Sequence, residues 1–203
     1  DFEVTNSNPD RPVSFPYRPA AIDTHAPRTK YINLIVHDGG QGFGFWSEAV
    51  DSEIYGCIIF NNGGEDRDHG IYTQNNAGTK LIEDNVIFNS YGSSIHGFGS
   101  GGTYNLVGYT FRGNVFVNDS GLIGNRPVRN LTFTNTGITS SRTIMFGSTG
   151  VTPVINCTLK NCNILGGNST SNAVVLCDGA AVNSPGYFNN ITIENNLVNK
   201  AFY

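Results

Sequence analysis

The densest group of ionisable side chains in this 203-residue sequence is the segment Glu65-Asp66-Arg67-Asp68-His69. Carboxylate oxygens are the ligands that Ca²⁺ prefers, so Glu65 and Asp66 are candidate calcium ligands. His69 and Asp68 are candidates for a catalytic general acid–base pair, because imidazole changes its charge near neutral pH. The alternative without a function is a solvated turn in which Arg67 pairs with a neighbouring carboxylate.

A column of aromatic side chains is expected beside this segment. Strand-like stretches occur at residues 44–48, 70–74, 94–98 and 121–125, and alternate side chains of a strand face opposite sides of its sheet. The expected inward residues are Phe45, Ile71, Ile95 and Leu122. The expected outward column is Trp46, Tyr72, His96 and Ile123, with Glu48, Gln74, Phe98 and Asn125 beside it.

Flat aromatic rings stack on sugar rings, and Glu and Gln side chains form hydrogen bonds with hydroxyl groups. We therefore predict that this face binds a sugar chain. The predicted binding residues are Trp46, Glu48, Tyr72, Gln74 and His96. The alternatives are a face covered by a loop and a packing surface between protomers.

Similar strand-like segments recur along the chain at steps of 22 to 34 residues. They begin at Asn33, Cys57, Asn85, Asn114, Thr136, Cys162 and Asn196. A large apolar residue usually lies three positions earlier, at Ile54, Ile82, Phe111, Phe133, Leu159 and Ile193. Such a period predicts coils that stack at about 4.8 Å, the distance between paired strands.

Stacked coils place equivalent residues in columns, so Asn85 and Asn114 are expected to face inward as neighbours in an asparagine ladder. His37 is expected to extend a second ladder that contains Asn61, Asn89 and Asn118. Nine Leu in the whole chain are too few for a leucine-rich repeat. The variable step is unlike the hexapeptide repeat of a left-handed β-helix, and crossover connections are normally right-handed.

The predicted fold is all-β: one domain over residues 1–203, a right-handed parallel β-helix of about seven coils. Residues 1–27 are expected to form an irregular or partial first coil. The sequence lacks a recognisable capping helix at either end, so it is expected to be part of a longer helix. Ile32–Val36 and Leu197–Val198 should then contact another chain or further sequence.

Composition limits the classes of function. Charged residues make up 14% of the chain, the net charge is −4 and no basic run occurs, which argues against nucleic acid as a partner. No apolar stretch of about 18 residues is present, so membrane insertion is not expected. The four cysteines do not have metal-site spacing, which leaves buried thiols or one disulfide among Cys157, Cys162 and Cys177.

Three segments carry a resemblance to a known family: Tyr31–Trp46, Ser47–Cys57 and His69–Asn75. They resemble bacterial right-handed parallel β-helix repeat proteins of the pectate-lyase-like superfamily, over roughly residues 4–120. The resemblance implies a secreted protein, extracellular or at the cell surface, related to polysaccharide lyases and glycoside hydrolases. Asp68-His69-Gly70 matches part of the G-H-G pattern of polygalacturonases.

Two functions are therefore expected, from different classes. The first is a secreted carbohydrate-active protein that binds an extracellular polysaccharide and, if it is an enzyme, cleaves it as a lyase or glycoside hydrolase. Its catalytic candidates are Asp68 and His69. The second is a structural or adhesive β-solenoid without catalysis, which self-associates through its open ends into a filament, spike or surface assembly.

Overall fold

The computed structural model describes residues 2–5, 19–63, 68–91, 93–97, 106–117, 121–123, 128–129, 132–134, 137–140, 144–146, 154–166, 174–175 and 188–198. Within these residues every regular element is a β-strand and none is a helix. The predicted all-β class is therefore confirmed. In the same residues no helical segment suited to crossing a bilayer is found.

The strands form four sheets, which we name A to D. Sheet A contains β1 (Phe2–Thr5), β4 (Leu34–His37), β7 (Ile58–Phe60), β10 (Val86–Phe88), β14 (Val115–Val117), β18 (Gly137–Ser140), β22 (Asn163–Gly166) and β26 (Leu197–Val198), in that order. Sheet B contains β2 (Ile22–Thr24), β5 (Phe43–Phe45), β8 (His69–Thr73), β11 (Ser93–Gly97), β15 (Gly121–Ile123), β19 (Ile144–Phe146) and β23 (Val174–Val175).

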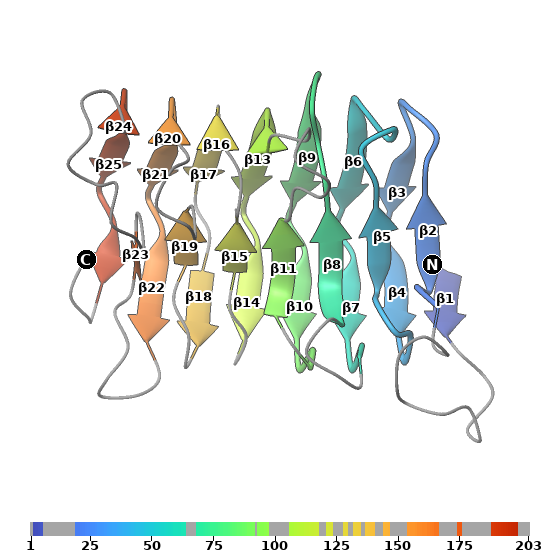
Figure 1. The fold of residues 1–203 in the computed structure, drawn as a ribbon. Helices are drawn as coiled ribbons and strands as arrows, with labels where there is room; N and C mark the ends of the chain where they lie inside the picture. Colours follow the sequence, from blue (N-terminus) through green and yellow to red (C-terminus); the bar gives the residue numbers. More distant parts are fainter. Residues whose placement is uncertain are drawn as a thin grey trace.

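Sheet C contains β3 (Lys30–Ile32), β6 (Ser52–Tyr55), β9 (Lys80–Glu83), β13 (Tyr109–Arg112), β17 (Thr132–Thr134), β21 (Thr158–Lys160) and β25 (Thr192–Glu194). Sheet D contains β12 (Leu106–Val107), β16 (Val128–Arg129), β20 (Val154–Ile155) and β24 (Phe188–Asn189). Each strand pairs in parallel with the equivalent strand one repeat further along the chain, as in a β-solenoid (Figure 1).

The predicted apolar column is confirmed on sheet C. Its six residues pair in sequence order: Ile54 with Ile82, Ile82 with Phe111, Phe111 with Phe133, Phe133 with Leu159 and Leu159 with Ile193. Ile54, Ile82 and Phe111 are all 0% exposed. Full burial of such a side chain stabilises the fold by about 1.5–3 kcal/mol, so each of these three coils adds its own share of the core.

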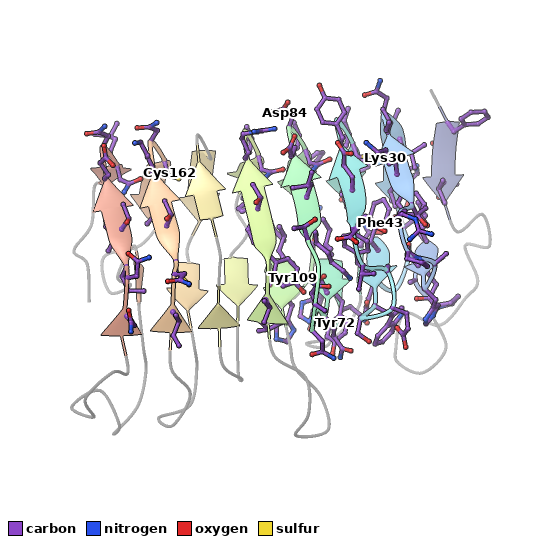
Figure 2. All side chains as sticks on the ribbon, turned by 90° about the horizontal axis from the view of Figure 1, so that it is seen from above. Lys30, Phe43, Tyr72, Asp84, Tyr109 and Cys162 are labelled. Atoms are coloured by element: carbon purple, nitrogen blue, oxygen red, sulfur yellow. The ribbon has the colours of Figure 1, made fainter. Side chains whose placement is uncertain are left out.

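Sheets A and B supply the other walls of this core. On sheet A the buried side chains are Val36, Ile59, Ile87 and Phe116, and on sheet B they are Phe43, Phe45, Ile71 and Ile95. Figure 2 shows Phe43 between the sheets and Tyr72 at the outer edge. The register of β15 contradicts the expected inward position of Leu122, because Gly121 pairs with the buried Ile95 and Leu122 pairs with His96.

The asparagine ladder is confirmed by hydrogen bonds. Asn85 and Asn114 are both 0% exposed, and the Asn85 Nδ2 donates to Asn114 Oδ1 over 3.0 Å. The Asn85 side chain also binds the backbone of the corner: its Oδ1 accepts from the Cys57 N–H at 2.8 Å, and its Nδ2 donates to the Ile54 carbonyl at 3.0 Å. Further along the chain, Asn196 Oδ1 accepts from the Cys162 N–H at 2.9 Å.

Left-handed backbone at one corner explains which residues precede the ladder. The corner residues between sheets C and A have positive φ: Asn33 (55°), Gly56 (65°), Asp84 (52°), Gly113 (64°), Asn161 (55°) and Asn195 (53°). Asn, Asp and Gly tolerate this conformation best. At Gly113 a Cβ would collide with the Asp84 carboxylate, so a side chain at this rung requires that carboxylate to move.

The first rung of the predicted repeat was misplaced by one residue. Ile35 pairs with Ile58, so Leu34, and not Asn33, occupies the position of Cys57. Asn33 instead provides the left-handed corner that Gly56 provides one coil later. The error arose because Asn suits both a ladder and a left-handed corner.

The same shift changes the role of His37, and the prediction that it extends the second ladder is wrong. His37 pairs with Phe60 and stacks on it with 4.7 Å between ring centroids, and Phe60 stacks on Phe88 at 5.1 Å. The second ladder itself is present, because Asn89 Nδ2 donates to Asn61 Oδ1 over 2.5 Å. Asn118 lies outside the described residues.

The described cysteines are free thiols. Cys57, Cys157 and Cys162 are buried, and Cys177 lies outside the described residues.

The expectation that Ile32–Val36 need an external partner is wrong for β4, because β1 of the same chain pairs with it from Phe2 to Thr5. At the other end β26 is the last strand of sheet A, and Leu197 is 62% exposed.

The ladder predicts a large effect of one substitution. Asn85→Leu would leave the Cys57 N–H, the Ile54 carbonyl and Asn114 without this partner in a dry interior, and each unsatisfied group costs about 1–3 kcal/mol. We expect the free energy of unfolding in urea to fall by about 3 kcal/mol or more. Asn89→Gly, which keeps a positive φ at an exposed rung, is the control. Equal stability of the two variants would contradict a structural role for the ladder.

Candidate functional site

A row of rings crosses the outer side of sheet B on three neighbouring repeats. The Trp46 and Tyr72 centroids lie 5.2 Å apart, and those of Tyr72 and His96 lie 5.8 Å apart. All three side chains are partly exposed. We call these three residues the ring row, and it brings together three of the five predicted binding residues.

The strand register differs from the one that the sequence predicted. Tyr72 pairs with His96 as expected, but its other neighbour is Gly44, and Trp46 lies two residues beyond Gly44. His96 pairs with Leu122, and Ile123 pairs with Gly97, so Ile123 is not in the column. Phe98 and Asn125 lie outside the described residues.

Trp46 joins the row because Gly44 has no side chain. A Cβ on Gly44 would lie 2.9 Å from the Trp46 Nε1 and 2.3 Å from the Asp23 Oδ1. The indole therefore occupies the space that a side chain at position 44 would fill, and its N–H donates to the Asp23 carboxylate. Glycine at position 44 therefore lets the Trp46 ring align with Tyr72 and His96, although Trp46 lies two residues beyond their register position.

His25 was not predicted from the sequence and extends the row by one ring. Its imidazole stacks on Trp46 with 5.9 Å between centroids and lies 3.6 Å from Asp23 and 3.7 Å from Glu48. The strand register explains the position of His25. Thr24 pairs with Phe45, so the following residues, His25 and Trp46, are equivalent. His25 lies before Asn33, the first residue of the predicted repeat.

Glu48 and Gln74, the other two predicted binding residues, have different surroundings. The Glu48 side chain is 63% exposed beside His25 and Trp46, where it can accept hydrogen bonds. Gln74 is only 4% exposed, and its Nε2 donates to the Tyr72 hydroxyl over 2.9 Å. Gln74 therefore supports Tyr72 from below.

The catalytic candidates Asp68 and His69 are both 4% exposed. His69 Nδ1 lies 2.9 Å from the Ser93 Oγ, and His69 Nε2 lies 2.6 Å from the His96 Nδ1. Burial, with an added effect of charge on His96, lowers the pKa of His69 to about 3, and burial lowers the pKa of His96 to about 4. Both imidazoles are therefore neutral at pH 7.

Lys80 is a buried lysine beneath the ring row that was not predicted as a site residue from the sequence. Its Nζ donates to the Phe45 carbonyl at 2.8 Å and the Trp46 carbonyl at 2.5 Å, and lies 3.9 Å from the centroid of the Phe45 ring. The side chain is 0% exposed, and burial lowers the pKa of Lys80 to about 7, although Glu48 acts in the opposite direction. Lys80 thereby fixes the turn that carries Trp46.

The predicted calcium ligands Glu65 and Asp66 lie outside the described residues, and that site stays a prediction. Among the residues that the structure does describe, no group of three or more His, Cys, Asp or Glu side chains is placed to hold a metal ion. What the described site offers is therefore exposed aromatic surface, two carboxylates and two neutral imidazoles.

No family model, no curated protein and no solved structure matches the chain. The fold and the site thus rest on the chain's own geometry: parallel strands in stacked sheets, consistent with a β-solenoid, and a ring row on one face.

Gly44→Ala tests how Trp46 reaches the row. The added methyl group would collide with the indole and with Asp23, so we expect Trp46 to move outward. Trp46 is the single tryptophan of the chain, so its emission should shift to longer wavelength and acrylamide should quench it more strongly. Thr110→Ala on sheet C is the control. Unchanged emission in Gly44→Ala would contradict the packing described above.

Lys80 predicts a pH dependence of stability. In the folded chain Lys80 loses its proton near pH 7, whereas in the unfolded chain it keeps it to about pH 10.4. The folded state then binds fewer protons between these values, so stability should rise with pH by up to about 1.4 kcal/mol per unit. Lys80→Met should lack this gain from pH 7 to 9 in urea denaturation, whereas the exposed Lys30→Met should retain it. Parallel pH profiles of wild type and Lys80→Met would contradict the prediction.

Proposed function

We propose that the chain is a right-handed parallel β-helix of about seven coils, of the pectate-lyase-like kind, that binds an extracellular polysaccharide on sheet B. The observation that carries the proposal is the ring row, in which three partly exposed rings follow one another at 5.2 and 5.8 Å. An extracellular or cell-surface location belongs to the same proposal.

The chemistry of the row suits a sugar chain. Aromatic faces contact the apolar C–H surface of sugar rings, while nearby polar groups fix orientation through hydroxyl groups. Trp46 and Tyr72 supply the aromatic surface, Asp23 and Glu48 supply acceptors at one end, and His96 supplies a ring nitrogen at the other. The supports beneath the row, Gln74 and Lys80, hold these groups in place and so reduce the entropy lost on binding.

Cleavage of the polysaccharide, by a lyase or glycoside hydrolase reaction, is the second part of the proposal. Asp68 and His69 stay its catalytic candidates, and His69 reaches the exposed face through its contact with His96. Replacement of His69 should abolish turnover and leave most of the binding intact if it serves acid–base chemistry. A Ca²⁺ ion held by Glu65 and Asp66 is the proposed cofactor.

A non-catalytic assembly unit is the second candidate, and apolar surface on sheet A favours it. Ile58, Val86 and Val115 are 41%, 37% and 40% exposed in one row, and Leu197 on the last strand is 62% exposed. Paired copies would cover such surface. The molar mass in solution, measured by light scattering across a concentration series, tests this candidate directly.

Alanine substitutions in the ring row test the proposed function. Trp46→Ala and Tyr72→Ala should each weaken binding to a responsive polysaccharide by about 1–3 kcal/mol, as loss of an aromatic anchor does. Folding stability should change little, because both side chains are partly exposed. Tyr55→Ala, an exposed tyrosine on sheet C, is the matched control. Absence of binding and cleavage across acidic and neutral polysaccharides, with and without Ca²⁺, would remove the proposal.

A further inference from the structure

Tyr72 and Gln74 lie two residues apart along one extended segment, so their side chains leave the backbone on the same side. Tyr72 belongs to β8, and the Gln74 N–H continues the sheet by donating to the Phe45 carbonyl over 3.1 Å. Gln74 is 4% exposed, whereas Tyr72 is partly exposed. A buried amide therefore supports an aromatic ring that reaches the outer edge of the coil (Figure 2).

The hydrogen bond between these two side chains determines where the Tyr72 hydroxyl proton points. Gln74 Nε2 donates to the Tyr72 oxygen over 2.9 Å, so this oxygen is the acceptor. A phenol O–H stays close to the plane of its ring because the oxygen is conjugated with it, which leaves two directions for the proton. The Gln74 N–H occupies one direction, so the proton points in the other. Within the part of the chain that the structure describes, Gln74 is the one hydrogen-bond partner of this hydroxyl.

The hydroxyl keeps its proton at neutral pH. Burial raises the pKa of Tyr72, and the bond from Gln74 acts in the opposite direction. The ring is also held in place, because its centroid lies 5.2 Å from that of Trp46, 5.8 Å from that of His96 and 6.3 Å from that of His69. A neutral donor with a fixed direction loses little entropy when a ligand binds to it.

The groups at the Trp46 end of the row are acceptors. The Trp46 indole N–H already donates to the Asp23 carboxylate, so Trp46 offers apolar ring surface to a ligand. The Asp23 and Glu48 side chains are 55% and 63% exposed, and their carboxylates accept hydrogen bonds. A sugar chain carries hydroxyl groups that donate to such carboxylates and ring and glycosidic oxygens that only accept. It therefore suits a face on which a donor lies beside acceptors.

From these contacts we infer that Tyr72 is a specificity-determining residue, whose hydroxyl donates one hydrogen bond to an acceptor oxygen of the bound sugar chain. Gln74 is the positioning residue that directs this donor away from the interior. The inference rests on the proposed function and deepens it. The Tyr72 ring provides apolar contact with the sugar, and its hydroxyl selects the atom that lies beside it.

The sign of one pKa change tests the direction of the bond without any sugar. A donor to the Tyr72 oxygen stabilises the phenolate, so Gln74→Met should raise the pKa of Tyr72. If Tyr72 donated to the amide oxygen instead, the same substitution would lower it. The measurement is a pH titration of the tyrosine ¹³Cζ signals by NMR, with Tyr72 assigned from Tyr72→Phe. Gln41→Met, which removes the other glutamine of the chain, is the control. A lowered or unchanged pKa in Gln74→Met would overturn the inference.

Two tyrosine variants separate the hydroxyl from the ring. Calorimetry with cellohexaose, xylohexaose, mannohexaose and hexagalacturonate first identifies the hexasaccharides that wild type binds. Tyr72→Phe keeps the ring and should weaken that binding about three- to tenfold, the effect of one lost hydrogen bond. Tyr72→Ala should weaken it further, because the apolar contact is lost as well. Tyr55→Phe on sheet C, where the tyrosine is exposed, is the matched control and should bind as wild type does.

The positioning role of Gln74 is tested in two backgrounds, because Gln74 has a further interaction besides the bond to Tyr72. In the presence of Tyr72, Gln74→Met should weaken binding severalfold. In a Tyr72→Phe background it should have no further effect, because no hydroxyl remains to be directed. Equal weakening in both backgrounds would overturn the positioning role. If urea denaturation shows that Gln74→Met does not fold, Tyr72→Phe still decides whether the hydroxyl contributes.

The outcomes separate this inference from the proposed function. Binding of no hexasaccharide by wild type would overturn both. Binding that Tyr72→Ala weakens and Tyr72→Phe leaves unchanged would retain the ring row and overturn the role of the hydroxyl.

Discussion

Parallel pairing between equivalent strands of successive repeats is the constraint on which the rest of this structure depends. It places each residue directly beside its counterpart one coil later, at about 4.8 Å, so any side chain that suits a position must also suit its own neighbour. Apolar residues meet this condition by stacking in the core, as Ile54, Ile82 and Phe111 do. Asparagine meets it in a dry interior because its amide both donates and accepts, which lets Asn85 and Asn114 bond each other and the corner backbone.

The ring row on sheet B follows from the same pairing. Tyr72 and His96 are adjacent because β8 and β11 pair at these residues. Trp46, which follows the last residue of β5, reaches the row only because Gly44 leaves the space open. Because the pairing fixes the backbone, the shape of the surface depends on whether each side chain is small or large. Here the single glycine Gly44 allows three rings to align.

Burial under the row governs its electrostatics. Lys80, His69 and His96 are basic residues, yet the first is satisfied by main-chain carbonyls and the other two share a hydrogen bond that requires a neutral partner. Lys80 and His69 are consequently turned away from solvent. Carboxylates at Asp23 and Glu48 complete a surface of aromatic rings and hydrogen-bond acceptors.

The sequence by itself determined the all-β class, the column from Ile54 to Ile193 and the ladder pair Asn85–Asn114. Stacked coils place equivalent residues beside one another, so apolar and amide residues recur in the sequence with the period of the coils. It also predicted that Trp46, Tyr72 and His96 share a face. Tertiary structure alone decided the register at Asn33, His37 and Trp46. A sequence pattern does not show the conformation of the turns, so it does not distinguish registers that differ by one or two residues. It alone revealed His25 in the row, the burial of Gln74 and Lys80, and the contact of His69 with Ser93 and His96. Those features depend on the positions of side-chain atoms in space. Residue types and their spacing specify only the place of each residue along its strand.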